Sequence, residues 1–208
     1  MYELARIIQY REEKDGTTLR IFVPGIRLGD MLQRKCIKNT EIRFDDGRHI
    51  SVEQRKKAYA TIRDIADWMG DIPEYTKECM KSEHIIRTGD AYFSLSNCSM
   101  DIAREFINTL MEFAIENGVP LTECGVERTD DIGSYLYYCL KHKKCAICGT
   151  DGEIHHEDAI GMGNDRRKVD DSGHRKICLC RKHHIIAHQM GVVRFRQMYK
   201  IYGITVNE

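Results

Sequence analysis

The sequence predicts an α+β fold, with a small N-terminal sheet and packed helices followed by a short C-terminal module that metal ligands hold together. Two predicted strands, two capped amphipathic helices and a dense group of cysteines and histidines lead to this prediction. An apolar fraction of 42% beside 31% charged residues is typical of a soluble globular protein. No segment approaches the roughly 20 apolar residues that a membrane-spanning helix needs.

The first part of the chain alternates apolar and polar residues on both sides of a polar turn that ends at Gly16. Pro24 and Gly25 end the second apolar run. We therefore expect a pair of strands (2–10 and 17–24), a short helix (within 26–36) and a further strand or hairpin (41–50).

Ser51 starts the clearest helix of the chain, because Ser51 and Gln54 match a capping box and Gly70 is a typical helix stop. Apolar residues at helical spacing predict a face toward the core: Val52, Tyr59, Ile62, Ala66 and Met69. Four cations lie mostly on the other faces: Arg55, Lys56, Lys57 and Arg63. They form either a solvated surface or a set of phosphate contacts.

The remaining elements follow from caps and periodicity. We expect a segment from Pro73 to Glu83, a strand at 91–95, a helix from Ser99 to Asn117, a helix at 129–142 beginning at Thr129, a strand at 153–156, a loop at 158–173, and helices at 181–190 and 191–202. The second strong helix carries a core stripe: Ile102, Phe106, Leu110, Phe113 and Ala114. Two domains are predicted, 1–130 and 131–208, with the boundary in a helix.

Six of the nine histidines and four of the nine cysteines lie between Cys145 and His188. Two short ligand pairs stand out by their spacing, namely Cys145-x2-Cys148 and Cys180-x2-His183. Three thiolates and one imidazole are the ligand set of a closed, tetrahedral structural zinc site. Cys178 is a competing ligand, but its spacing to Cys180 gives poorer knuckle geometry.

A second ligand set consists of histidines alone: His155, His156, His184 and His188. His184 and His188 are four residues apart, so a helix places both on one face. His155 and His156 point to opposite faces if they lie on a strand, so one can bind a metal while the other acts as a base. Three protein ligands with open positions are typical of a catalytic site.

Two simpler interpretations of this region are a zinc ribbon that only binds DNA or a partner, and disulfide bonding. Four histidines beyond those that one zinc ion needs weigh against the ribbon. Nine cysteines without a secretory signal favour a reducing cytoplasm, which weighs against disulfides. We expect the other five cysteines to be small buried or half-buried residues: Cys36, Cys79, Cys98, Cys124 and Cys139.

The order C-x2-C, His-His, then L-C-x2-H-H and a further His resembles the HNH (ββα-metal) endonucleases over residues 140–195. The resemblance implies that His156 is the general base, and that His155, His184 and His188 hold a catalytic Mg²⁺ or Mn²⁺ ion during phosphodiester hydrolysis. The family commonly has an Asn before the second knuckle, and none is present here. His174 is the candidate for its role, and Arg175 or Arg181 for contact with the scissile phosphate.

Residues 49–70 and 96–121 resemble segments of the Orf (NinB) proteins of lambdoid phages, on the two capped amphipathic helices. That resemblance implies a homodimeric recombination mediator that binds single-stranded, gapped or branched DNA. It further implies loading of a recombinase on DNA coated by single-strand-binding protein, in the cytoplasm of a phage-infected bacterium. Arg55, Lys56, Lys57 and Arg63 would line the DNA channel.

The net charge is zero, but residues 141–208 carry 13 basic and 8 acidic residues, a balance of +5, and residues 1–140 carry the opposite balance. A basic nuclease-like end suits a phosphate-binding module. Together, the two resemblances imply a phage-type recombination protein with metal-dependent HNH endonuclease activity. The alternatives are a non-catalytic DNA-binding mediator and a site-specific homing or restriction enzyme, for which residues 1–125 contain no recognisable base-reading element.

Overall fold

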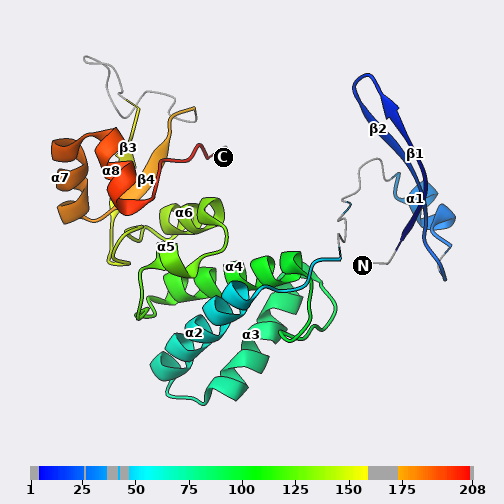
Figure 1. Cartoon of the computed structure of the whole chain (residues 1–208), viewed down its shortest axis with the longest axis horizontal. Coiled ribbons are helices and arrows are strands. Elements are labelled where there is room, and N and C mark those ends of the chain that lie inside the picture. Colours follow the sequence, from blue (N-terminus) through cyan, green and yellow to red (C-terminus); the bar gives the residue numbers. More distant parts are fainter. Residues whose placement is uncertain (1–4, 26, 37–41, 43–46, 159–172, 207–208) are drawn as a thin grey trace.

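A computed structural model of the 208-residue chain describes residues 5–25, 27–36, 42, 47–158 and 173–206. These residues form an α+β fold with two separate two-stranded antiparallel sheets, which confirms the predicted class. Figure 1 shows a helical body, made of α2 to α6, that connects an N-terminal hairpin to a C-terminal module of β3, β4, α7 and α8.

The predicted pair of N-terminal strands is confirmed. The elements are β1 (Arg6–Glu13), β2 (Gly16–Phe22) and the short helix α1 (Gly29–Arg34). The strands pair antiparallel, with an irregularity between Ile7 and Gln9, and all but one of their residues are exposed. Half of the strand or hairpin expected at 41–50 (residues 41 and 43–46) lies outside the described residues.

Three long helices form the helical body: α2 (Val52–Met69), α3 (Pro73–Thr88) and α4 (Met100–Asn117). The Ser51 side chain accepts a hydrogen bond from the Gln54 backbone, and the Gln54 side chain accepts one from the Ser51 backbone, so the predicted capping box is present. Gly70 and Gly118 end α2 and α4 at φ values of +72° and +67°, which glycine adopts without strain.

Two predictions for this body are wrong. Val52, Tyr59 and Met69 were expected in the core but are 64%, 40% and 46% exposed, because the packed face of α2 is centred on Ala58, Ile62 and Ile65. A helical residue lies about 100° around the axis from its neighbour, so Tyr59 falls to one side of that face.

Residues 91–95 were expected to form a strand but are irregular. Their alternating pattern arises because Phe93 and Leu95 are buried as loop residues. The Phe93 ring packs edge-on against Phe106 of α4, with 5.2 Å between ring centroids. Packing on a helix therefore produces the alternation that a half-buried strand would show.

The helix expected at 129–142 is present as α6 (Ile132–Lys141), which begins three residues later than predicted, and a separate short helix, α5 (Gly125–Arg128), precedes it. Asp131, rather than Thr129, caps α6 by accepting a hydrogen bond from the Ser134 backbone. Tyr135 donates a hydrogen bond of 2.9 Å to the Ala146 carbonyl. This bond ties α6 to the segment that begins the C-terminal module.

The C-terminal module consists of β3 (Glu153–His156), β4 (Lys176–Leu179), α7 (Arg181–Met190) and α8 (Val192–Tyr199). β3, α7 and α8 are confirmed, and β4 was not predicted. The strands pair antiparallel with His155 opposite Ile177, and Ile204, which follows α8, forms an isolated bridge with Lys176. The loop expected at 158–173 falls largely outside the described residues.

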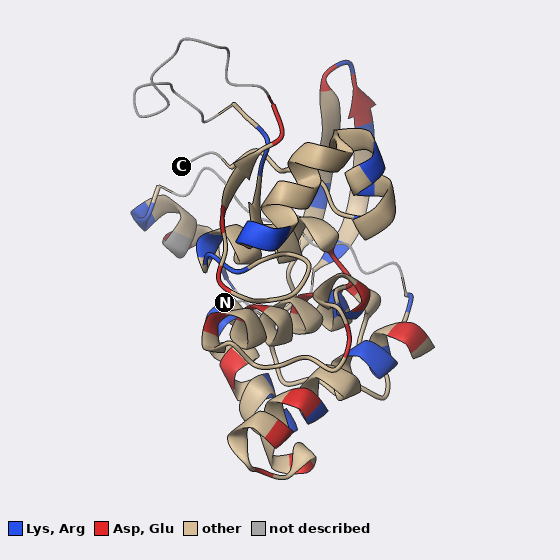
Figure 2. Ribbon diagram, turned by 90° about the vertical axis from the view of Figure 1, so that its left-hand side faces the viewer, with Lys and Arg blue, Asp and Glu red and all other residues tan. Residues whose placement is uncertain are grey.

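One core runs from the helical body into the module, since α6 packs on both α4 and β4. Charges of both signs are interspersed along the helices (Figure 2). Cys98 and Cys139 are buried and Cys79 is half-buried, as expected, whereas Cys36 and Cys124 are exposed. No helix in the described part of the chain combines the length and apolar character needed to cross a membrane.

Candidate metal centres

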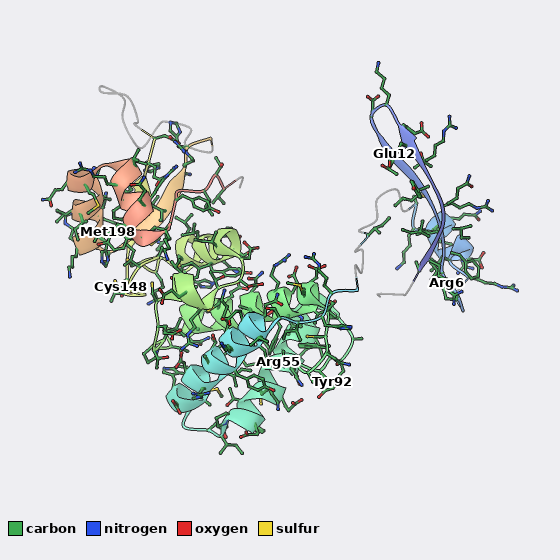
Figure 3. All side chains as sticks on the ribbon, viewed as in Figure 1. Arg6, Glu12, Arg55, Tyr92, Cys148 and Met198 are labelled. Atoms are coloured by element: carbon green, nitrogen blue, oxygen red, sulfur yellow. The ribbon has the colours of Figure 1, made fainter. Side chains whose placement is uncertain are left out.

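The first ligand group lies where the segment between α6 and β3 meets the start of α7. Cys145 and Cys148 lie in a turn closed by a hydrogen bond from the Gly149 backbone to the Cys145 carbonyl, and Gly149 has a φ of +71°. Cys180 is the N-cap of α7, and His183 lies in its first turn. Figure 3 labels Cys148 on this connecting segment, outside the regular elements. The two pairs predicted from spacing therefore meet at one point.

The distances within this group suit a tetrahedral zinc ion. The ligand atoms of Cys145, Cys148, Cys180 and His183 all lie within 4.8 Å of one another. The Cys148 and Cys180 sulfurs are 3.7 Å apart, and His183 Nδ1 is 3.4 Å from the Cys145 sulfur and 3.2 Å from that of Cys180. Zinc bonds of about 2.3 Å to sulfur and 2.1 Å to nitrogen give edges of about 3.8 and 3.6 Å. The donor set and its spacing thus fit a closed structural zinc site.

Cys178, the competing ligand considered from the sequence, lies outside this group. It is fully buried in β4, and its sulfur occupies the space beside Gly152, where an added Cβ would come within 2.8 Å of it. Burial raises the pKa of the Cys178 thiol to about 11. Cys178 is therefore a small apolar residue of the core.

The second group is formed by His155 of β3 with His184 and His188 of α7. Their ligand atoms lie within 4.8 Å of one another, and the ring centroids are 4.7, 4.8 and 4.9 Å apart. The i, i+4 spacing puts His184 and His188 on the side of α7 that faces His155. Burial lowers the pKa of His155 to about 4, helped by the charges of its two neighbours, so at neutral pH the ring offers a lone pair. The three residues can hold one divalent ion.

A carboxylate supports this histidine group from outside. Glu153 Oε1 lies 2.5 Å from His184 Nδ1, and the hydrogen bond from His184 lowers the pKa of Glu153. With Nδ1 engaged, Nε2 is the His184 atom left to bind an ion. Carboxylates that orient metal-binding histidines in this way are common around catalytic ions. Glu153 was not among the predicted site residues, although it lies two residues before His155 and so on the same face of the strand.

Comparison with known proteins identifies the family. A family model described as "Putative HNHc nuclease" matches residues 26–208. The chain belongs to this family. No curated protein and no solved structure gives a significant match. Because the HNHc model extends over the helical body as well as the module, and the comparisons give no evidence for an Orf (NinB) domain, the expected fusion to such a domain is not supported.

In this member of the HNHc family, the predicted base His156 is partly exposed and pairs with Lys176 across the β3–β4 ladder. Alternation along the strand directs it to the face opposite His155. His174, expected to replace the family's Asn, lies just before β4 and is partly buried, and its Nδ1 has no hydrogen-bond partner among the described residues. Neither residue belongs to the three-histidine group.

Of the two arginines expected at the phosphate, Arg175 is already paired with a carboxylate. Its backbone and guanidinium groups both donate to Asp158, which holds the pKa of Asp158 well below its usual range. Arg181, in contrast, is 83% exposed at the start of α7, and its guanidinium lies 3.7 Å from Glu153. Arg181 is therefore the better placed of the two to reach a ligand beside the histidines.

The four cations of α2 have different environments. Arg55 donates to the carbonyls of Leu95 and Ser96, and Lys57 donates to the Thr129 carbonyl and lies 3.6 Å from Asp130. Lys56 forms an exposed ion pair with Glu53, and Arg63 is exposed. Lys57 is therefore engaged by other residues of the chain, whereas Arg55, Lys56 and Arg63 border one surface.

Proposed function

We propose that this HNHc nuclease is a metal-dependent endonuclease that hydrolyses phosphodiester bonds in DNA. The convergence of His155, His184 and His188, with ligand atoms within 4.8 Å of one another, is the observation that carries the proposal. Three imidazoles with room for further ligands are an open site, unlike the closed group of three cysteines and one histidine beside it. Mg²⁺ or Mn²⁺ is the proposed catalytic ion.

A bound divalent ion supplies Lewis-acid stabilisation of the charge that develops on the phosphate and on the leaving 3′ oxygen. His156 takes a proton from the attacking water, the general-base role that histidine fills most often in enzymes. Glu153 keeps His184 in the orientation in which Nε2 faces the ion. Arg181 contacts the phosphate through its guanidinium.

The structural zinc site holds this arrangement in place. Cys180 and His183 immediately precede His184 on α7, so the group of three cysteines and one histidine fixes the start of the helix that carries two ligands of the open site. The zinc therefore has a structural role, and the exchangeable ion has the catalytic role.

The proposed substrate is single-stranded, gapped or branched DNA, and the proposed setting is recombination in the cytoplasm of a phage-infected bacterium. A homodimer, with single-strand-binding protein and a recombinase as partners, belongs to the same proposal. These finer points rest only on the local similarity of residues 49–70 and 96–121 to segments of phage recombination mediators, and no family match accompanies that similarity.

Replacing the base tests the proposal. We expect His156→Ala to reduce nicking of gapped and branched DNA in Mn²⁺ by at least about a hundredfold, because general-base catalysis contributes on that scale. Zinc content and DNA affinity should remain as in the wild type. His49→Ala, a histidine substitution outside the module, is the matched control and should cleave normally.

Reactions without added divalent ion establish whether cleavage requires an ion of the kind proposed for the three-histidine group. If wild-type protein binds these substrates without cutting them in Mg²⁺ or Mn²⁺, the protein is a DNA-binding mediator with an inactive nuclease module. If His156→Ala cuts at the wild-type rate, His156 is not the base.

A further inference from the structure

The outward face of α2 combines an exposed aromatic ring with three cations. A shallow groove of about 410 Å³ is lined by residues that recur at helical spacing along this face: Val52, Arg55, Lys56, Tyr59, Ala60 and Arg63. Tyr59 is 40% exposed, and Val52 is 64% exposed. Because Arg55 and Arg63 lie four residues before and after Tyr59, their side chains flank its ring.

The charge of this face is positive and only weakly compensated. Within the described part of the chain, no carboxylate forms an ion pair with Arg55 or Arg63. The ion pair of Lys56 with Glu53 is solvent-exposed on both sides, at 69% and 73%, so it contributes little and a phosphate can replace Glu53. Three cations therefore border a mainly apolar groove, where they can meet the phosphates of an anionic ligand.

Arg55 is held ready for such a contact. Its Nε and one terminal nitrogen donate to the carbonyls of Leu95 and Ser96, at 3.0 and 2.9 Å, which fixes the guanidinium without neutralising it. Figure 3 labels Arg55 on α2 beside the segment that carries these carbonyls. A guanidinium held by neutral partners keeps its full charge and has less side-chain entropy to lose on binding.

We propose that this face of α2 is a binding surface for single-stranded nucleic acid, with Tyr59 as the platform on which a base stacks and Lys56, Arg55 and Arg63 as phosphate contacts. An exposed aromatic ring between cations is the combination that sequence-independent single-strand binding uses. Duplex DNA keeps its bases stacked inside and offers no free base to the ring. The inference rests on the proposed function in that it names the form of nucleic acid presented to the nuclease module.

The surface lies on an element different from those that carry the metal ligands. Tyr59 and its cations belong to α2 in the helical body, whereas the histidines belong to β3 and α7 of the C-terminal module (Figure 1). Binding at α2 therefore adds affinity for a substrate strand without taking part in bond cleavage. Its loss should raise KM and leave kcat nearly unchanged.

Binding of a fluorescent 20-nucleotide oligo(dT), measured by anisotropy with zinc-loaded protein and no added Mg²⁺ or Mn²⁺, tests the proposal directly. We expect Tyr59→Ala to weaken binding about tenfold, since stacking on one base is worth a factor of that order. Tyr59→Phe, which keeps the ring, should stay within about twofold of the wild type. Tyr75→Ala removes another exposed tyrosine, on α3, and should bind as the wild type does.

The salt dependence of binding separates stacking from phosphate contact. Arg63→Ala should reduce the slope of log affinity against log salt concentration by roughly 0.7, the value expected for one lost phosphate contact on a single strand. Tyr59→Ala should leave that slope unchanged. The same oligonucleotide as a duplex should bind more weakly and be insensitive to Tyr59→Ala.

Binding of oligo(dT) that is unchanged in Tyr59→Ala, or reduced equally in Tyr59→Ala and Tyr75→Ala, overturns the proposal and leaves this face as a solvated or protein-binding surface. Equal sensitivity of duplex binding to Tyr59→Ala also overturns it. Because the assay measures binding without turnover, it remains decisive if the protein proves to have no nuclease activity.

Discussion

Glu153 shows how a single side chain determines which atom of a neighbouring residue can bind a metal. Its carboxylate engages Nδ1 of His184 and so directs Nε2 toward the position shared with His155 and His188. Without this contact the imidazole can rotate about its χ2 torsion. Ion binding would then have to offset the entropy lost when the ring is ordered. The carboxylate would therefore contribute to the affinity for the proposed ion without contacting that ion.

We expect Glu153→Gln to weaken Mn²⁺ binding at the histidine site about tenfold, because a neutral amide orients and polarises His184 less well. Calorimetric titration of zinc-loaded protein with Mn²⁺ measures this affinity. Asp151→Asn is the matched control: Asp151 is 92% exposed and pairs with Lys144, outside the histidine group. Equal losses in the two variants, or no loss in Glu153→Gln, would show that Glu153 does not position His184.

The ligand residues could be predicted from the sequence because metal coordination imposes short, recognisable spacings. The C-x2-C and C-x2-H pairs and the i, i+4 histidines come together as their spacing predicts. The partners of these residues could not be predicted in the same way. Glu153 reaches His184 across 31 positions of the chain, and Asp158 occupies Arg175 across 17. Such contacts depend on strand register and on loop geometry, which spacing alone does not determine.

Among the elements, helices with side-chain caps were predicted most closely. Ser51 and Ser99 each accept a backbone hydrogen bond at the start of α2 and α4, and glycine ends both helices, so their limits follow from local chemistry. β4 was missed because Ile177, Cys178 and Leu179 form a continuous buried run, which lacks the alternation of a half-buried strand. Its strand geometry depends on pairing with β3.

Removing the α2 cap gives a direct measure of this local contribution. We expect Ser51→Ala to lower the free energy of unfolding by about 1 kcal/mol, because the backbone N–H of Gln54 loses its acceptor, the Ser51 hydroxyl. Urea unfolding followed by circular dichroism provides the value. Ser82→Ala, at an exposed position inside α3, should change it by no more than about 0.5 kcal/mol. A loss at Ser51 no larger than that at Ser82 would contradict the role of the capping box.

For the whole molecule, the important feature is that the metal module and the helical body share one core. Tyr135 and Leu136 of α6 are buried together with Cys145, Ile177 and Leu179 of the module. The sequence suggested two domains divided within a helix, and α6 is the element in contact with both sides. Loss of the zinc group should therefore destabilise the helical body as well as the C-terminal module.

We expect Cys145→Ser to lose its zinc and to lower Tm by about 10 °C or more in one cooperative transition, because a structural zinc site contributes folding free energy directly. Differential scanning calorimetry and metal analysis measure the two effects. Cys36→Ser, which changes an exposed cysteine outside the group, should keep both zinc and Tm. Two separate transitions in the wild type would show that module and body unfold independently.

The most direct measurement is the number of metal ions that each chain binds and how tightly. Two coordination groups of different character, one closed and rich in thiolate and one open and made of imidazole, predict one zinc ion per chain that survives dialysis and one Mn²⁺ that exchanges freely. We expect His184→Ala and His188→Ala to lose the Mn²⁺ and keep the zinc. A protein that binds no second ion, or whose Mn²⁺ binding is unchanged by both substitutions, would contradict the open histidine site on which the nuclease proposal depends.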